Sequence, residues 1–272
     1  MNRTLLVILL AILGTTAKGA GWILYGSKTL MVDTFTCIAN LAALLAAVYY
    51  SRFINKEPDK GHPYGHLRLG LAGNYFVLLS YSFIAGLSLA SLVLEGPGEP
   101  PGGGAFYSAL AGLGFYAPIP LILRGDRSPL GVYGLFTISE LLESIIVITV
   151  VALSLEASPV FDYIGGYIVL LFVLYELYEN SASYITLTTD KAPPPRIVEG
   201  IRQAIQGQLG LSVKSLRLRT VYPGVYQGDV VVAVPVNYSI VDAHKIADEV
   251  ERLGKMLNTD LVVHIEPEEK GG

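Results

Sequence analysis

The chain has 272 residues, of which 52% are hydrophobic and only 15% are charged, and its mean hydropathy is +0.50. This composition excludes an ordinary soluble protein of this size and indicates an integral membrane protein. The net charge of −4 comes without a strongly basic face, which argues against nucleic acid as a partner, and the single cysteine excludes an internal disulfide framework.

The first apolar segment, residues 4–26, follows Arg3 and shows no small-residue cleavage pattern, so we expect a retained transmembrane helix rather than a signal peptide. It contains Lys18 at a depth where the ammonium needs a carboxylate, a carbonyl or a route to the membrane interface. Structural pairing is the simpler interpretation of this lysine.

The second segment, residues 29–51, is almost wholly apolar but carries Asp33 and, four residues later, Cys37. A charged side chain in hydrocarbon costs at least about 2.5 kcal/mol, so Asp33 should face the bundle interior or a water-filled cavity. One helical turn places Cys37 on the same face, where the two side chains could hold a metal ion. Alternatively, hydroxyl groups of neighbouring helices satisfy Asp33, and Cys37 only fills space.

The polar segment 55–68 is broken by prolines and glycines, so we expect an ordered loop rather than a helix. It contains Asp59, His62 and His66. A carboxylate with two imidazoles at this spacing suits Zn²⁺ and neighbouring divalent metals. The alternative is a solvated loop whose histidines cap helix ends.

Four further spans are expected at residues 67–94, 104–123, 130–154 and 159–187. Six spans put both termini on one side of the membrane. The two joints on that side carry the basic residues Arg52, Lys56, Lys60, Arg124 and Arg127, whereas the three joints on the other side carry only Lys28. By the positive-inside rule, the chain is expected to be a multi-pass protein of the cell membrane with both termini in the cytoplasm.

The fifth span breaks its apolar run with Ser139, Glu140 and Glu143. Residues three and four apart share a helix face, so Glu143 aligns with either Glu140 or Ser139. Two carboxylates in one membrane helix are hard to explain as packing. If Glu143 faces Asp33 across the bundle, a cation entering between them would release a proton. Glu140 has an alternative interpretation, in which it faces a tyrosine-rich or aqueous edge.

After Asp190, charged residues become frequent, which predicts a six-helix transmembrane domain at 1–190 and a soluble α+β domain at 191–272. Periodicity in the second part gives the order helix, strand, strand, helix, strand, typical of a ferredoxin-like domain that often dimerises. His244 opens the second helix. Alternation puts His264 and Glu266 on one face of the last strand, where they could share a metal ion.

Four motifs together resemble the cation diffusion facilitator family over nearly the whole chain. The most specific is D-K-G-H-P-Y-G-H-L-R at Asp59–Arg68, which is similar to the family's D-x-x-H-x-x-G-H-x-[RK] loop. The others are S-K-T-L-M-V-D at Ser27–Asp33, D-A-H at Asp242–His244 and V-H-I-E-P at Val263–Pro267. All four histidines of the chain lie inside these matches.

The resemblance implies a homodimeric six-helix transporter that exports divalent metals, Zn²⁺ most often, in exchange for protons, with a ferredoxin-like cytoplasmic domain. It makes Asp33 a transport-site ligand and places Cys37 where the family usually has a second Asp. In the fifth span, Ser139 and Glu143 stand where the family commonly has His-x-x-x-Asp.

The resemblance also assigns metal ligands outside the membrane. It matches Asp59, His62 and His66 to the family's loop site. In the C-terminal domain, the residues matched to ligands are His244, His264 and Glu266. Lys214 and the apolar strand 230–234 stand near the places of other expected ligand histidines, so that site is partial.

Two functions remain open from the sequence. The first is a divalent cation/proton antiporter with Asp33, Cys37 and Glu143 as ligands and Glu140 as a possible fourth. The metal is both its transported substrate and its regulator. Its partners are the lipid bilayer and a second copy of the chain. Zn²⁺ is the expected ion, with Mn²⁺, Fe²⁺, Co²⁺ and Cd²⁺ as alternatives. The second is a non-transporting member that senses metal or assembles with partners. No nucleotide loop or nucleophile arrangement suggests an enzyme.

Overall fold

The computed structural model describes residues 3–125 and 129–268, which fall into two compact units, Met1–Ala182 and Ser183–Gly272. Arg127, one of the basic residues considered above, lies outside the described residues. In chain order the elements are α1 (Arg3–Ile23), α2 (Lys28–Ser51), α3 (Leu69–Glu95), α4 (Gly104–Tyr116), α5 (Pro118–Ile122), α6 (Pro129–Glu156), α7 (Val160–Thr188), α8 (Pro195–Leu209), β1 (Ser212–Tyr222), β2 (Val225–Val234), α9 (Ile240–Met256) and β3 (Thr259–Pro267).

Six of these helical segments are long and apolar enough to cross a membrane, which confirms the predicted six-span architecture. The fourth span is built from α4 and α5 together, Gly104–Ile122. Its helix is interrupted at Ala117, immediately before Pro118. Ala117 keeps helical dihedral angles, and the break arises because proline lacks the backbone N–H that would continue the hydrogen bonds of the helix.

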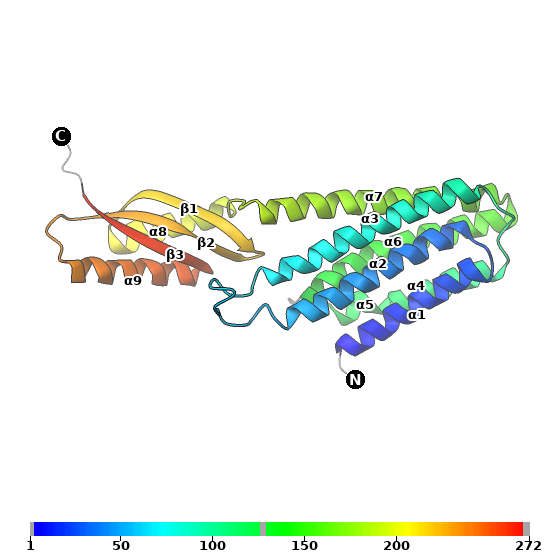
Figure 1. Cartoon of the computed structure of the whole chain (residues 1–272), viewed down its shortest axis with the longest axis horizontal. Coiled ribbons are helices and arrows are strands. Elements are labelled where there is room, and N and C mark those ends of the chain that lie inside the picture. The colour runs from blue at the N-terminus through cyan, green and yellow to red at the C-terminus, as the bar shows by residue number, and fades with distance from the viewer. Residues whose placement is uncertain (1–2, 126–128, 269–272) are drawn as a thin grey trace. The chain divides into compact units, whose positions relative to one another are not determined.

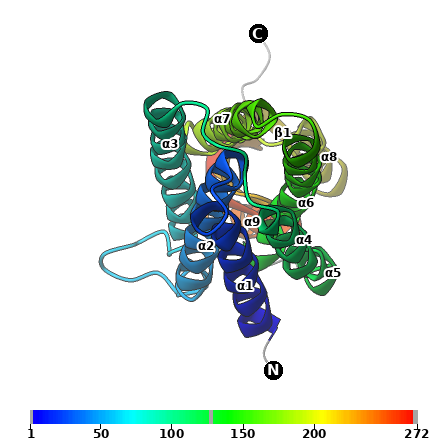
Figure 2. The same ribbon diagram turned by 90° about the vertical axis from the view of Figure 1, so that its right-hand side faces the viewer.

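The first unit is a helix bundle in which α2 packs against α1, α3 and α6, and α4 packs against α1 and α6. Figure 2 shows α3 and α7 at the edge of the bundle. In Figure 1 the beginning of α1 and the end of α7 lie at the same end of the bundle, as an even number of spans requires. The helices that surround α2 therefore place their inward side chains against its polar face.

Close contact between α1 and α4 depends on two glycines, one on each helix. A Cβ atom at Gly14 would lie 2.5 Å from a ring carbon of Tyr116, and one at Gly112 would lie 2.5 Å from Cγ of Lys18. Each glycine thus leaves room for a long side chain of the facing helix. This packing brings Lys18 and Tyr116 into the centre of the bundle, where both are fully buried.

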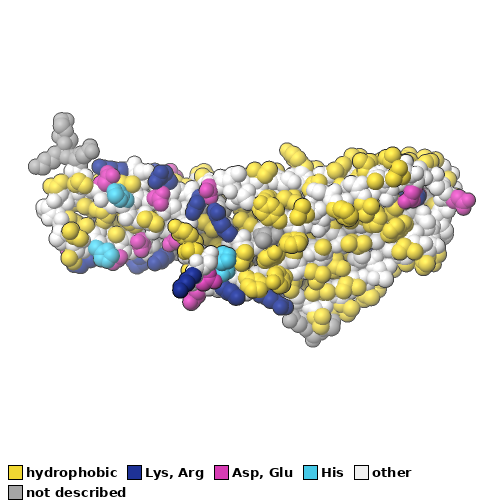
Figure 3. All heavy atoms as spheres, viewed as in Figure 1, with side chains coloured by type: hydrophobic (Ala, Val, Ile, Leu, Met, Phe, Trp, Pro, Cys, Tyr) yellow, Lys and Arg dark blue, Asp and Glu magenta, His cyan; other side chains and the backbone are white. Residues whose placement is uncertain are grey.

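The outer face of the helical unit is largely hydrophobic (Figure 3). Large apolar side chains are exposed along several helices, for example Leu79, Phe83, Leu121 and Leu171. Exposed apolar surface of this extent is unfavourable in water and suits contact with lipid chains. Several charged side chains of the unit, among them Lys18, Asp33 and Glu140, are instead buried inside it.

One end of the bundle is fastened by Asp162, a buried acid near the start of α7. Its carboxylate accepts hydrogen bonds from the Ser27 hydroxyl at 2.7 Å and from the backbone amides of Lys28 and Thr29 at 2.5 and 3.2 Å. Ser27 is itself the N-cap of α2 and accepts from the backbone N–H of Leu30. An acid at this position satisfies donors that a helix leaves unpaired at its first turn, and it joins α7 to α2.

The second unit is a three-stranded mixed sheet in the order β1-β2-β3 with two helices, and it confirms the predicted ferredoxin-like arrangement. β1 and β2 are antiparallel, and β2 and β3 are parallel because α9 makes the crossover between them. One face of the sheet forms a core with both helices; its fully buried side chains are those of Ile201, Ile205, Val230, Val232 and Val250. The opposite face carries polar pairs such as Arg217 with Asp229, 3.1 Å apart.

We expect Asp162→Ala to lower the free energy of unfolding by about 3 kcal/mol, because three buried donors lose their acceptor. Thermal unfolding of the full chain in detergent would measure this as a lower midpoint. Glu156→Ala is the matched control, since Glu156 is an exposed acid at the end of the neighbouring helix α6 and its removal should change little. Equal midpoints for the two variants would contradict the role given to Asp162.

Candidate metal sites

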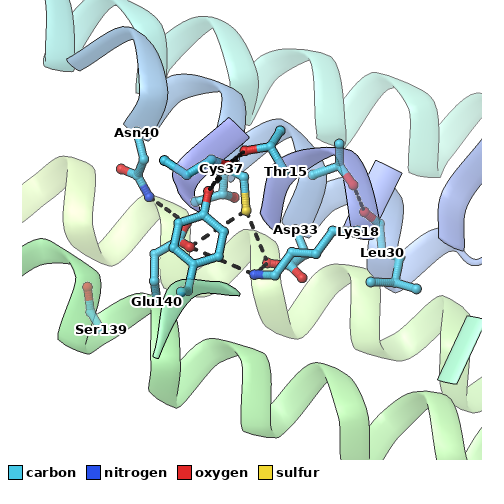
Figure 4. Close-up of polar contacts among 12 residues, drawn as sticks. Thr15, Lys18, Leu30, Asp33, Cys37, Asn40, Ser139 and Glu140 are labelled. Carbon is cyan, nitrogen blue, oxygen red and sulfur yellow. Dashed lines mark hydrogen bonds and ion pairs between the residues drawn. The ribbon is translucent and has the colours of Figure 1, made fainter. Parts of the chain in front are cut away.

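Asp33 and Cys37 lie on one face of α2, one helical turn apart, and both are fully buried. The Cys37 Sγ atom is 4.0 Å from Oδ1 of Asp33 (Figure 4). The i, i+4 spacing read from the sequence therefore does bring the two side chains together inside the bundle. The neighbouring threonine hydroxyls do not serve Asp33: Thr34 and Thr36 each donate to a backbone carbonyl of their own helix.

The partner of Asp33 is Lys18 of α1. The lysine Nζ donates to Oδ1 of Asp33 at 2.8 Å and lies 3.8 Å from Oε2 of Glu140 on α6. All three side chains are almost wholly shielded from solvent. Lys18, which the sequence left with a choice of a carboxylate, a carbonyl or an interfacial position, is paired with carboxylates.

Glu140 is held in the same network by α2. Its Oε1 accepts from the Asn40 side-chain amide at 2.6 Å, and its Oε2 lies 3.6 Å from Cys37 Sγ. Asn40 in turn accepts from the Tyr81 hydroxyl of α3. Glu140 is thus buried, and Asn40 connects it to the Tyr81 hydroxyl. Its alternative interpretation allowed an aqueous or a tyrosine-rich edge, and only the aqueous edge is wrong.

Glu143 is buried one turn further along α6, on the inner side of the bundle. Among the residues that the structure describes, no group donates a hydrogen bond to Oε1 of Glu143 or to Oδ2 of Asp33. Buried oxygen atoms of this kind are costly unless something supplies positive charge. Ser139 is directed elsewhere, since its hydroxyl donates to Glu176 of α7 at 2.5 Å.

The ring of Tyr116 covers the Lys18 ammonium in this network. The ring of Tyr116 on α4 lies 5.1 Å from Lys18 Nζ, measured to the ring centroid. Its hydroxyl shares a 2.9 Å hydrogen bond with Thr15 of α1. The ring excludes water from the ammonium, and its negative face favours a positive charge. The site therefore combines three acidic side chains, one thiol and one ammonium, all shielded from solvent.

The loop between α2 and α3 forms a second cluster, from Asp59, His62 and His66. His66 Nε2 lies 3.2 Å from Asp59 Oδ2, His62 Nδ1 lies 3.6 Å from Asp59 Oδ1, and the two imidazole rings are 4.4 Å apart. One ligand atom from each of the three side chains lies within 4.8 Å of the other two; within residues 3–125 and 129–268 no other group of three or more His, Cys, Asp or Glu side chains is this compact. The spacing that predicted a metal cluster has therefore placed its members together.

Backbone hydrogen bonds arrange the loop cluster in advance. The amides of His62 and Gly61 each donate to Asp59 Oδ1 at 2.8 Å, and these bonds, with His62 the larger cause, hold the pKa of Asp59 below its ordinary value. The carboxylate therefore keeps its charge to lower pH and loses these contacts only as the pH falls through that lowered pKa. Gly65, with φ of 82°, supplies the left-handed turn that returns the chain to His66.

The C-terminal candidates are only partly assembled. His264 and Glu266 lie on the same face of β3, with Nε2 and Oε1 3.8 Å apart, and Lys214 of β1 contacts the other oxygen of Glu266 at 3.2 Å. His244 on α9 is exposed and lies 3.7 Å from Asp248. In the described part of the chain, His244 does not form a compact group with His264 and Glu266.

Comparison with known proteins assigns both units. A family model described as the cation efflux transmembrane domain matches residues 4–186, and one described as the cation efflux protein cytoplasmic domain matches residues 193–268. The chain belongs to the cation diffusion facilitator family. It is also similar to an uncharacterized transporter of Methanocaldococcus jannaschii, with 24% identity over 263 residues that cover 89% of each chain. Membership of this family makes the chain a multi-pass membrane protein related to metal cation transporters.

Sequence reasoning missed several members of the membrane network. Asn40 is seven residues after Asp33 and three after Cys37, so helical periodicity alone could have placed it on the same face. Tyr81 and Tyr116 come from two other helices, and only the packing of the bundle brings them to the site. No spacing in the sequence signals contacts of that kind.

Removing both loop imidazoles, by His62→Ala with His66→Ala, should abolish one class of metal sites and leave the membrane network intact. Calorimetric titration of the full chain in detergent with Zn²⁺ would show a stoichiometry lower by about one ion per chain. Tyr64→Ala, which removes an exposed ring from the same loop and no candidate ligand, is the control. An unchanged stoichiometry in the double variant would mean that the loop histidines have a structural role only.

Proposed function

We propose that this protein is a divalent cation/proton antiporter that exports metal from the cytoplasm, with Asp33, Cys37, Glu140 and Glu143 as the ligands of its transport site. The observation that carries the proposal concerns two buried oxygen atoms, Asp33 Oδ2 and Glu143 Oε1. No described group donates a hydrogen bond to either of them. A divalent ion supplies the positive charge that such atoms lack.

Proton coupling follows from the chemistry of these ligands. Carboxylates and a thiolate bind a metal only in their deprotonated forms, so entry of the ion displaces protons from whichever of them carry one. Three acidic side chains in a water-poor space cannot all stay charged without a cation. Exchange of metal for protons therefore keeps the buried charge nearly constant during the transport cycle.

The ligand set bears on which metal is carried. The thiol of Cys37 favours Zn²⁺ or the softer Cd²⁺, whereas carboxylates without imidazole favour harder ions such as Mn²⁺, Fe²⁺ and Co²⁺. We propose Zn²⁺ as the substrate, because it accepts both sulfur and oxygen ligands. The loop cluster of Asp59, His62 and His66, which joins two imidazoles to a carboxylate, supports the same ion as a regulator.

The surrounding assembly follows the family. We propose a homodimer in the cell membrane, with both termini and the domain at residues 191–272 in the cytoplasm and the transmembrane domain at residues 1–190. Support comes from the match to the family's cytoplasmic domain and from the basic residues of the joints.

A second function, a metal-sensing or partner-assembling member that does not transport, is favoured by one specific observation. The ammonium of Lys18 lies between Asp33 and Glu140, so the membrane site already contains a cation. If that ion pair is permanent, metal would bind only outside the membrane, at the loop and the C-terminal domain.

Reconstitution in liposomes separates the two functions. Zn²⁺ added to one side should drive a proton flux for the wild type, whereas binding without flux would support the sensor. We expect Asp33→Asn to abolish the flux and to weaken metal affinity at the membrane site by at least about 100-fold, since loss of a group that only hydrogen-bonds to a ligand already costs about tenfold or more. Wild-type flux in this variant would remove Asp33 from the site.

The control for Asp33→Asn is Glu95→Gln. Glu95 is a partly exposed acid at the end of α3 that pairs with Lys28, outside the buried network, so its neutralisation should leave the flux unchanged. Gel filtration of both variants would establish that each retains the fold.

Cys37 offers a test of the ligand set. Cys37→Ser removes the strong sulfur ligand with little change in volume and should weaken Cd²⁺ binding more than Mn²⁺ binding, whereas Cys37→Asp should shift the preference toward Mn²⁺. Bound metal should also slow the reaction of Cys37 with a thiol reagent. Equal Cd²⁺ and Mn²⁺ affinities in the wild type and Cys37→Ser, with no protection of the thiol, would assign Cys37 to packing alone.

A further inference from the structure

The position between Asp33 and Glu140 is occupied by a side chain of the protein itself. Lys18 Nζ lies 2.8 Å from one acid and 3.8 Å from the other, and its side chain has no significant contact with solvent. An ammonium and a divalent metal ion compete for the same carboxylate oxygens, because both are attracted to the same negative charge and need it desolvated.

The bundle is shaped to hold the lysine in this place. Gly112 of α4 leaves the space that the lysine stem fills, since a Cβ there would lie 2.5 Å from Cγ and 3.1 Å from Cε of Lys18. The Tyr116 ring faces the ammonium at 5.1 Å and offers it a second, weaker contact through its π-electrons. The packing of α1 against α4 therefore positions the ammonium at the acids.

The lysine nevertheless leaves part of the acidic set unused. Oδ2 of Asp33 and Oε1 of Glu143 are buried, and no described residue donates a hydrogen bond to either atom. A divalent ion carries twice the charge of the ammonium, and each of these two oxygens could serve it as a ligand. The site is thus better suited to a divalent ion than to the single charge of Lys18.

We propose that Lys18 is a tethered competing cation of the transport site, which the substrate metal must displace and which returns to the acids when the metal leaves. This inference rests on the proposed transport function and adds a residue that determines affinity. The apparent metal affinity equals the intrinsic affinity multiplied by the fraction of time for which the acids are free. If Lys18 occupies them for nine-tenths of the time, metal binding is about tenfold weaker. Ions of a single charge gain little over the ammonium and are disfavoured.

The first test is Lys18→Met, which keeps the length of the stem and removes the charge. In a background with His62→Ala and His66→Ala, titration of the full chain with Zn²⁺ should give an affinity at the membrane site about tenfold higher than that of the same background with Lys18. The variant's thermal midpoint should also rise more on addition of Zn²⁺, because Asp33 and Glu140 lack their cation until metal binds. Asp33→Asn supplies the blank for both measurements.

A second variant retains the lysine and disturbs its place. Gly112→Ala puts a methyl group against the Lys18 stem and should raise Zn²⁺ affinity in the same direction, by a smaller factor. Gly114→Ala on the same helix is the matched control, because a Cβ there meets nothing within 4 Å. This pair of variants keeps the test valid if Lys18→Met does not fold.

The outcomes separate this inference from the proposed function. Unchanged or weaker Zn²⁺ affinity in both Lys18→Met and Gly112→Ala would overturn the competition by Lys18, even where the wild type exchanges Zn²⁺ for protons. Binding at the membrane site in Lys18→Met but not in the wild type would support the competition and overturn the antiporter in favour of the non-transporting member. Absence of membrane-site binding in every variant would overturn both.

Discussion

Moving an ammonium and a carboxylate out of water costs several kcal/mol for each ion, and the attraction between Lys18 and Asp33 offsets that cost only while both are held at hydrogen-bonding distance. Several residues of the helical unit help to hold these charged groups together. Gly112 admits the lysine stem, Tyr116 shields the ammonium, and Asn40 fixes Glu140 beside it. Displacement of α1, α2 or α6 would separate these buried charges, so the ion pair favours the observed packing of the three helices.

Most of the fold follows from patterns that depend on neighbouring residues in sequence. Six apolar segments predicted the six membrane helices, and the alternation of residues in the last eighty positions predicted the order of helices and strands. The break at Ala117 was not foreseen, although Pro118 is its local cause. The role of Asp162 could not be predicted either, because its partners Ser27 and Thr29 are more than 130 residues away and meet it only in the packed bundle.

The candidate sites divide in the same way. Asp59, His62 and His66 are close in sequence, and their cluster was predicted from spacing alone, as was the approach of Cys37 to Asp33. For contacts between helices, the cost of burying a charge predicts that a partner is needed, but it does not predict which residue the partner is. The hydrocarbon environment required a partner for Lys18, yet only the structure identifies Asp33 and Glu140 in that role. Spacing also allowed Ser139 to align with Glu143, whereas the structure shows its hydroxyl donating to Glu176.

The two metal candidates differ in what must happen before an ion binds, and that difference fits the separate tasks of regulation and transport. In the loop, backbone amides hold Asp59 as a charged ligand beside two imidazoles, so a metal can bind without moving another cation. At the proposed transport site, Lys18 would first have to leave the acids that it contacts. A transport site has to release its ion as well as capture it, and one that binds without competition would hold a divalent ion too tightly among three buried carboxylates. In the proposed cycle, an ammonium that returns to Asp33 would replace the departing charge, so that the ion could leave without exposing unpaired acids to the membrane interior.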